Sequence, residues 1–318
     1  MKALVTGCGG QDGYFISKYL NRAGVSVYGL TKPGSAPLNS AVGNHLHEIY
    51  EVDLTDFDQV SDKITTLLPD IIVNLAAQAD SWGQFSDPIK LFETNTVSVI
   101  NVLETIRATA LSTRFYQASS SEIFAGGTKA PQSLNSAPAA RTLYGASKIS
   151  SDEIVRVYRQ HYGMACARIV FFSHESPLRK PGYFSSSLVN QAIDVAVGKK
   201  EKIVIYSPDS TRDWGYAGEY CRRVVDHINS RKMEDIIVGS GIFHTVREFA
   251  QEVCKQMGLE YKAVVVEHDE LVGRAKEMTL VYAKSNSDGF LGDKLSYDLP
   301  KLIKLLIRFA KLNRKNEK

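Results

Sequence analysis

Lys2-Ala3-Leu4-Val5-Thr6, followed by Gly7-Cys8-Gly9-Gly10-Gln11-Asp12-Gly13, is the stretch of sequence that decides the fold. It places glycines at every third position between an apolar strand pattern and a helical pattern over 14–23. Small residues there let the backbone approach a pyrophosphate, and the start of the helix supplies amide donors and partial positive charge. We therefore predict a dinucleotide site and assign to it Gly7, Gly10, Gln11, Asp12 and Gly13. A tight turn that binds no ligand is the alternative.

The first half of the chain continues the alternation of strands and helices. It predicts strands at Lys2–Thr6, 25–30, 48–53, 70–77, Arg114–Ser120 and 166–172, and helices at 14–23, 57–68, 88–108 and from Tyr144 onward. Such alternation is typical of a parallel sheet covered on both faces. The predicted fold class is α/β: a Rossmann-type doubly wound parallel sheet with a smaller, interleaved C-terminal substrate domain.

Two positions after the second predicted strand bear on the choice of cofactor. An acidic residue there would hold the ribose hydroxyls of NAD, whereas a basic residue accommodates the 2′-phosphate of NADP. The chain has Thr31 and Lys32, and the next acidic residue is Glu48, so we predict NADP. Further cofactor contacts are expected where the next strands end, from Asp53, Leu54, Leu75, Ala76 and Ala77.

Beyond residue 172 the regular alternation of strand and helix patterns ends. Prolines, Gly182 and a serine run precede a helical pattern over 188–197, and Ile203–Tyr206 and Ile236–Val238 look like strands that rejoin the sheet. We predict an NADP-binding domain at 1–172, with returning segments near 201–240, and a mainly substrate-binding domain at 173–318. Apolar residues at helical spacing over 301–318 predict an amphipathic helix that closes the core, with a membrane-surface helix as the alternative.

The spacing of Tyr144 and Lys148 predicts acid–base chemistry. They lie one helical turn apart, so the lysine charge favours the phenolate of a tyrosine that takes up a proton. Tyr14/Lys18, Tyr28/Lys32 and Tyr297/Lys301 have the same spacing but do not follow a matching strand. The strand that precedes Tyr144 ends in further candidates, and the predicted catalytic residues are Ser120, Glu122, Tyr144 and Lys148, with Ala118, Tyr144 and Lys148 also contacting the cofactor.

Composition narrows the class of protein. The 318 residues are 44% hydrophobic and 23% charged, which is ordinary for a globular protein large enough for two domains. A net charge of +3 is too small for the basic surface of a nucleic-acid binder, so we expect none. The four cysteines are widely spaced and the seven histidines scattered, and no apolar run approaches a bilayer span. We expect a cytoplasmic protein with no metal and no membrane contact.

Several segments taken together resemble the extended short-chain dehydrogenase/reductase superfamily, and most closely its GDP-mannose 4,6-dehydratases. The resemblance spans about 1–250 and is carried, in order, by Gly10-Gln11-Asp12-Gly13, Asp53-Leu54-Thr55-Asp56, Leu75-Ala76-Ala77-Gln78, Phe115-Tyr116-Gln117-Ala118-Ser119, Tyr144-Gly145-Ala146-Ser147-Lys148, His174-Glu175-Ser176-Pro177, Arg212-Asp213-Trp214-Gly215 and Val246-Arg247-Glu248-Phe249. It implies an NADP-dependent nucleotide-sugar 4,6-dehydratase. In this family the enzyme oxidises C4 of the sugar, eliminates water across C5 and C6, and returns the hydride to C6.

The same resemblance implies roles for individual residues. Tyr144 would take the proton of the 4-hydroxyl, Ser120 would bond the 4-oxygen, and Glu122 would remove the C5 proton. Arg212 would meet the diphosphate of the nucleotide sugar. The implied substrate contacts are Gln84, Ser173, Glu175, Arg212 and Arg274.

The chain departs from the family where the substrate is read. It has Ala79-Asp80 in place of serine-histidine, Gln84-Phe85-Ser86 in place of serine-phenylalanine-glutamate, Ser173 in place of asparagine, and Ser185-Ser186-Ser187-Leu188 where an arginine-lysine pair is expected. These departures argue against GDP-mannose itself and favour another nucleotide sugar. Pro33 and Gly34 alter the loop that forms tetramers in the family, so we expect a homodimer built on the two long helices.

Two other functions remain open from the sequence. A reductase of 4-keto-6-deoxy sugars, or an epimerase, of the same superfamily would share Tyr144 and Lys148 but need no return of hydride to C6. A non-catalytic protein that senses NADP would keep the fold without the chemistry.

Overall fold

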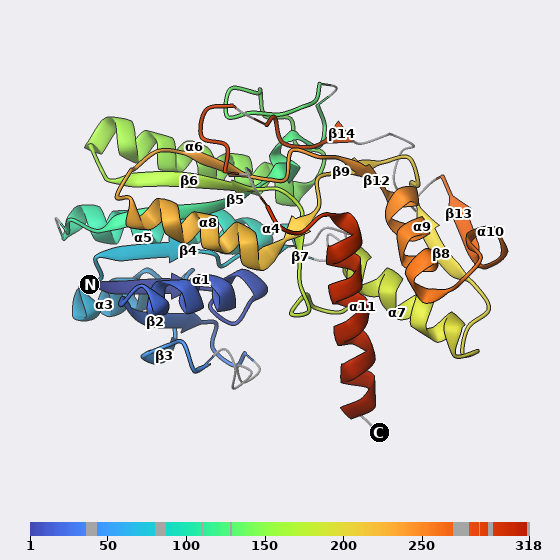
Figure 1. The fold of residues 1–318 in the computed structure, drawn as a ribbon. Coiled ribbons are helices and arrows are strands. Elements are labelled where there is room, and N and C mark those ends of the chain that lie inside the picture. The colour runs from blue at the N-terminus through green and yellow to red at the C-terminus, as the bar shows by residue number, and fades with distance from the viewer. Residues whose placement is uncertain are drawn as a thin grey trace.

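The computed structural model describes residues 1–35, 43–79, 87–109, 111–127, 129–269, 280–285, 287–291 and 295–316. Gln84 and Arg274, two of the predicted substrate contacts, lie outside these residues. Within them the chain forms a large sheet flanked by helices and a smaller lobe that carries the C-terminal helix (Figure 1).

The main sheet has seven strands within the described residues, all parallel, in the order β11-β6-β5-β4-β1-β2-β3. Its strands are β1 (Lys2–Thr6), β2 (Ser26–Thr31), β3 (Glu48–Glu51), β4 (Ile71–Asn74), β5 (Arg114–Ser120), β6 (Cys166–Phe171) and β11 (Ile236–Val238). The order reverses between β1 and β4, which opens a crevice at the carboxyl ends of these strands. The predicted α/β, doubly wound fold class is confirmed.

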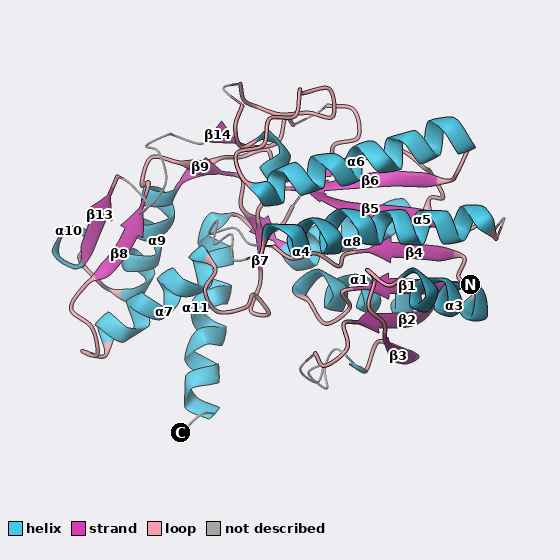
Figure 2. Cartoon of the chain, turned by 180° about the vertical axis from the view of Figure 1, so that it is seen from behind, coloured by secondary structure: helices cyan, strands magenta, loops and turns pink. Residues whose placement is uncertain are grey.

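Helices cover both faces of this sheet (Figure 2). Successive side chains of each strand point to opposite faces, and the apolar side chains on both faces must be shielded from water. Ala3 and Val5 pack toward α1 (Gln11–Arg22) and α8 (Ala217–Asn229). Leu4 belongs to the opposite core, which includes side chains of α3 (Phe57–Leu67) and α5 (Ser98–Ala108). α6 (Leu143–Tyr162) covers this second face beside β5 and β6.

The helix predicted over 88–108 is interrupted. α4 (Pro88–Phe92) begins with Asp87 as its N-cap, and a π-helical turn at Glu93–Val97 leads into α5. The turn directs Asn95 inward, where its side chain exchanges hydrogen bonds with the backbone of Gln78 and donates to Ser147 Oγ at 2.9 Å. Asn95 thereby ties α6 to the loop after β4, next to the predicted catalytic tyrosine.

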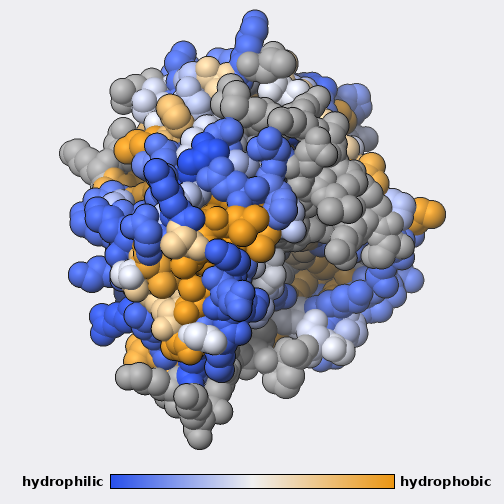
Figure 3. Space-filling model, turned by 90° about the vertical axis from the view of Figure 1, so that its right-hand side faces the viewer, coloured by the Kyte–Doolittle hydropathy of each residue, from blue (hydrophilic) through white to orange (hydrophobic). Residues whose placement is uncertain are grey.

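The smaller lobe is built around a core of its own. It contains α7 (Phe184–Ala196), β8 (Ile203–Tyr206), α9 (Val246–Met257), α10 (Tyr261–Val264), β13 (Val265–His268) and α11 (Leu299–Asn316). Seen from the right-hand side of Figure 1, hydrophilic side chains surround an area of apolar ones (Figure 3). Such a mixture is ordinary for a surface that faces water.

Short strands connect the two parts. β7 (His174–Glu175) pairs with β10 (Gly215–Tyr216), while β9 (Thr211–Arg212) lies between β12 (His244–Thr245) and β14 (Leu280–Val281). Ile236–Val238 joins the main sheet as predicted. The prediction that Ile203–Tyr206 also rejoins it is wrong, because β8 pairs in parallel with β13 in the smaller lobe.

The predicted amphipathic C-terminal helix is confirmed as α11. Leu302, Ile303, Leu306 and Ile307 are buried in the core of the smaller lobe, so its apolar face closes that core. In the part of the chain that the structure describes, no helix is both long and apolar enough to cross a bilayer.

Candidate active site

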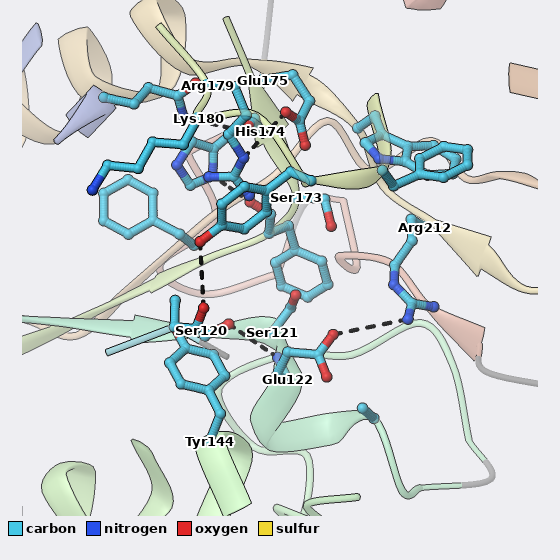
Figure 4. Close-up of a pocket in the computed structure, with 18 of the residues that line it drawn as sticks. Ser120, Ser121, Glu122, Tyr144, Ser173, His174, Glu175, Arg179, Lys180 and Arg212 are labelled. Carbon is cyan, nitrogen blue, oxygen red and sulfur yellow. Dashed lines mark hydrogen bonds and ion pairs between the residues drawn. The ribbon is translucent and has the colours of Figure 1, made fainter. Parts of the chain in front are cut away.

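A cleft of about 960 Å³ opens at the carboxyl edge of the main sheet and extends to the smaller lobe. Most of the residues predicted for the site line it: Gly7, Gly10, Gln11, Asp12, Gly13, Leu75, Ala77, Ala118, Ser120, Glu122, Tyr144, Lys148, Ser173, Glu175 and Arg212. Figure 4 shows Ser120, Glu122 and Tyr144 on one side of the cleft, with His174, Glu175 and Arg179 on the other.

The remaining predicted cofactor residues do not line this cleft. Thr31 ends β2 and is followed by Lys32, and Asp53 and Leu54 follow β3 at the same edge of the sheet. Hydrogen bonds from Thr55 are the main reason why the pKa of Asp53 is lowered, and the charge of Lys32 lowers it further. Ala76 lies directly behind Gly7. These residues therefore lie at the same edge of the sheet as the cleft, but outside the cleft itself.

The glycine loop has the close packing that a dinucleotide loop needs. Gly7 has a φ of +63°, and a Cβ on it would lie 2.9 Å from the backbone nitrogen of Ala76. A Cβ on Gly13 would lie 2.6 Å from backbone atoms of Cys8. Gly10 is the N-cap of α1, so free amides at the start of this helix face the cleft. The residues present thus fit a dinucleotide whose pyrophosphate lies against this turn.

Asp12, which the sequence assigned to the dinucleotide site, has a partner on a distant segment of the chain. Asp12 Oδ1 lies 2.8 Å from Nε2 of His174, and Gln11 contributes a weaker contact at 3.3 Å. Gln11 also joins the two segments, because it donates to the carbonyl of His174 and accepts from Ser176 Oγ at 2.7 Å. The glycine loop is therefore tied to β7.

Burial and pairing act in opposite directions on the Asp12–His174 pair. Burial is the largest influence on each pKa and disfavours both charges. The attraction and hydrogen bond between them outweigh it, so the pKa of Asp12 is lowered and that of His174 is raised. An ion pair at this position neutralises a carboxylate that would otherwise repel phosphates.

We expect His174→Asn to destabilise the fold most at low pH and less at alkaline pH. A group whose pKa is raised in the folded state stabilises fully below its unfolded value, about 6.5, and loses this contribution as pH rises through the folded pKa. The difference amounts to about 1.4 kcal/mol for each pH unit by which the folded pKa exceeds the unfolded one. Urea unfolding of both proteins at about pH 6 and about pH 9 measures it. A gap between them that is equal at both pH values would contradict the ion pair.

The catalytic candidates are held by β5, the turn after it and α6. Ser120 is the N-cap of a 3-10 turn at Ser121–Phe124, and its Oγ accepts from the backbone amide of Glu122 at 3.2 Å. Thr142 caps α6, so this helix starts immediately before Tyr144. Gly145 allows close contact between the two, since a Cβ there would lie 2.7 Å from the carbonyl oxygen of Glu122. The arrangement brings Glu122 beside Tyr144.

Burial, the largest influence, raises the pKa of Tyr144, and the charge of Glu122 raises it further, whereas the hydrogen bond with Ser120 lowers it. Lys148 Nζ lies 5.9 Å from the centre of the Tyr144 ring and donates to the carbonyl of Ala118 at 2.9 Å. Its charge thus sits below the ring. Burial lowers the pKa of Lys148 to about 8.

Glu122 Oε1 lies 3.8 Å from an Nη atom of Arg212, and both side chains are partly exposed to the cleft (Figure 4). The carboxylate of Glu175 is buried and already occupied by Ser185 Oγ at 2.6 Å and by Arg179 at 3.3 Å. Glu122 is therefore the more accessible carboxylate for a reacting group. Trp214 lines the cleft but packs on Phe184 and Phe249, which makes it part of the core of the smaller lobe as well.

Cys8 is buried in the glycine loop, and burial raises the pKa of its thiol to about 11. The thiolate that oxidation requires is therefore disfavoured, and the structure agrees with a small residue tolerated in a tight turn.

Several cleft residues were missed by the sequence analysis. Arg179, Lys180 and Tyr183 line the cleft, and Figure 4 shows Arg179 and Lys180 on the side opposite Tyr144. The Arg179 guanidinium stacks on the Tyr183 ring, with 3.9 Å between the guanidinium carbon and the ring centre. Their signal was their place immediately after His174-Glu175-Ser176-Pro177. Tyr206 and Gln191, from the smaller lobe, carried no comparable signal.

Comparison with known proteins identifies the family. Residues 4–294 match the family model described as GDP-mannose 4,6 dehydratase. GDP-mannose 4,6 dehydratase 2 of Arabidopsis thaliana is 30% identical in an alignment that covers 96% of this chain and 85% of that protein.

Solved structures share the fold at lower identity. A dTDP-glucose 4,6-dehydratase from Streptomyces venezuelae, solved with NAD, superposes with a TM-score of 0.83 at 20% identity over 99% of this chain and 98% of that one. The RMD protein of Pseudomonas aeruginosa, solved with NADPH, gives 0.78 at 19% identity over 98% and 99%. The family match covers most of the chain and agrees with the motifs in the sequence, so this protein belongs to the GDP-mannose 4,6-dehydratase family of extended short-chain dehydrogenase/reductase enzymes.

Proposed function

We propose that the protein is a nucleotide-sugar 4,6-dehydratase that works with NADP and releases a 4-keto-6-deoxy sugar nucleotide. The observation that carries this proposal is the position of Glu122 beside Tyr144, with Ser120 two residues before Glu122 at the end of β5. Simple oxidation of an alcohol needs one proton acceptor. Elimination of water from C5 and C6 needs a second, and Glu122 supplies it.

The first step belongs to Tyr144, which removes the proton of the sugar 4-hydroxyl while Ser120 donates a hydrogen bond to the 4-oxygen. Lys148 stabilises the phenolate form of Tyr144 by its positive charge. A nicotinamide dinucleotide, which Gly7, Gly10 and Gly13 would hold, would supply the hydride acceptor for C4 and the hydride donor for C6, so that no net cofactor is consumed.

The second step belongs to Glu122. The ketone at C4 makes the C5 proton acidic, and Glu122 removes that proton and gives it to the 6-hydroxyl, which leaves as water. After hydride has reached C6, C5 takes up a proton, and Tyr144 releases the one it took from the 4-hydroxyl, so the net change is the loss of a single water. Arg212, 3.8 Å from Glu122, is in position to bind the diphosphate of the substrate at the same wall.

The choice of NADP rests on Lys32. We expect Lys32→Ala to raise the Kd for NADP about tenfold and to leave the Kd for NAD nearly unchanged, because the lysine would pair with the 2′-phosphate alone. Fluorescence titration with both dinucleotides measures the two constants. Lys200→Ala, which removes an exposed lysine of the smaller lobe, is the matched control. Equal losses for NAD and NADP would point to a general effect on the loop and argue against NADP selection.

The identity of the base and sugar is part of the same proposal. The substitutions at Ser173 and at Ser185 to Leu188 support a nucleotide sugar other than GDP-mannose. Incubation with NADP+ and GDP-, CDP-, UDP- and dTDP-hexoses, followed by mass spectrometry, tests this without added reductant. Loss of one water, about 18 daltons, from one member identifies the substrate. Turnover of 4-keto-6-deoxy sugars alone, with consumption of NADPH, would replace the dehydratase by a reductase.

We also propose that 1–172 binds the cofactor and 173–318 mainly the substrate, and that the protein is a cytoplasmic homodimer formed through α5 and α6. Cys8, Cys166, Cys221 and Cys254 are free and buried, in keeping with a reducing compartment. Light scattering after size-exclusion chromatography tests the dimer.

A further inference from the structure

Asp152 is a buried carboxylate that the mechanism above does not use. It lies one helical turn after Lys148 on α6, and the two residues are 3% and 2% exposed. Its Oδ2 accepts a hydrogen bond of 2.8 Å from Ser119 Oγ, on β5. Oδ1 is buried and has no hydrogen-bond partner among the described residues. A carboxylate so deeply buried is costly unless a nearby cation compensates for it.

The charges of two cations, Arg168 and Lys148, act on this carboxylate. Arg168, on β6, lies 3.7 Å from Asp152 Oδ2, beyond good hydrogen-bond distance. Arg168 instead binds Asp235 through its Nε and Nη atoms at 2.8 and 2.7 Å, and Asp235 also pairs with Arg159. Since Arg168 is committed to Asp235, Lys148 is the other cation available to Asp152.

Lys148 also needs a counter-ion, because its charged side chain is buried. Among the described residues, its ammonium group donates one hydrogen bond, to the carbonyl of Ala118 at 2.9 Å. Burial lowers the pKa of Lys148 to about 8, and the charge of Asp152 acts against this shift. Burial raises the pKa of Asp152 to about 6, while Arg168, Ser119 and Lys148 act to lower it. Between these two values both groups are charged.

We propose that Asp152 is a positioning residue of the reaction: it is the buried counter-ion that keeps Lys148 protonated beneath Tyr144, and Ser119 fixes its orientation. The inference rests on the proposed function in that a charged Lys148 matters because it stabilises the Tyr144 phenolate. The groups that act on this pair come from each packed element: Tyr144 from α6, Ser119 from β5, Arg168 from β6 and Asp235 from the segment before β11.

The direct test follows the titration of Lys148 by NMR in protein labelled at lysine Cε, with Lys148→Arg to identify its signal. In Asp152→Asn, which retains an oxygen to accept from Ser119, we expect the midpoint of Lys148 to fall by about one to two pH units. Glu153→Gln is the matched control: it removes a carboxylate from the next position of the same helix, but that side chain is 53% exposed and pairs with Arg156. The control should leave the midpoint unchanged.

A second arm measures the pH–rate profile with the substrate found above. Loss of the lysine charge should move the alkaline fall in kcat to lower pH by the same amount in Asp152→Asn, whereas a merely structural role would lower the unfolding temperature without moving it. Ser119→Ala should shift the Lys148 midpoint and the alkaline midpoint of kcat in the same direction, but by less. It takes the place of Asp152→Asn as the test variant if Asp152→Asn does not fold. An unchanged Lys148 midpoint in a folded variant would overturn the proposal. A shifted midpoint in a protein that turns over no nucleotide sugar would retain the counter-ion and reject the proposed function.

Discussion

Tyr144→Phe is expected to lower kcat/KM about a thousandfold while the protein still folds and binds its dinucleotide. The phenol is the group that receives the proton of the 4-hydroxyl, and removal of a positioned acid–base group costs about 100- to 10,000-fold in rate. Tyr144 is held by α6 and by close contact of Gly145 with the carbonyl of Glu122, so a phenylalanine ring should take the same place. Initial rates and cofactor titration on the same preparation measure both quantities.

The chain contains a control with nearly the same geometry. Tyr14 and Lys18 also lie one turn apart, with the Lys18 ammonium 5.4 Å from the centre of the Tyr14 ring, compared with 5.9 Å for Lys148 and Tyr144. Tyr14 is on α1 and is not among the residues that line the cleft. Tyr14→Phe should therefore leave the rate unchanged. Full activity in Tyr144→Phe with cofactor still bound would instead favour the non-catalytic protein that senses NADP.

Comparison of sequence and structure shows why the dinucleotide half could be predicted. Its glycine spacing and its alternating apolar runs are local signals, and consecutive strands usually pair with each other, as β1 and β2, β2 and β3, β4 and β5, and β5 and β6 do. The error at Ile203–Tyr206 has the opposite cause. A four-residue apolar run indicates a strand but does not indicate its neighbour, and its partner β13 lies about sixty residues further along the chain.

The residues of the site also fall into those that the sequence could predict and those that it could not. Ser120, Glu122, Tyr144 and Lys148 could be found because they follow one strand and open one helix. The pairing of Asp12 with His174 joins residues 162 positions apart, which no periodicity reports. Asp152 and Asn95 were overlooked because polar residues within a helix usually face water, and only the packed structure reveals that these two are buried.

Glu122→Gln should abolish formation of the 4-keto-6-deoxy product, with a loss of about a thousandfold, yet leave the first hydride transfer largely intact. Glutamine has nearly the same shape but cannot take the C5 proton. It also leaves Arg212 in place, although without the carboxylate 3.8 Å away. Substrate should therefore be oxidised at C4 and held there, so that the absorbance of reduced nicotinamide rises in a single turnover and does not fall again.

Exchange with solvent separates this step from oxidation. In deuterium oxide the unaltered enzyme should place deuterium at C5 of its product, and Glu122→Gln should place almost none in the sugar it retains. Glu153→Gln, the same substitution at an exposed carboxylate of α6, should behave as the unaltered enzyme does.

A reductase or epimerase needs Tyr144 and Lys148 but no base for C5 elimination. If Glu122→Gln kept most of its rate with a 4-keto sugar, the carboxylate beside Tyr144 would serve binding alone, and the assignment would pass to the reductase.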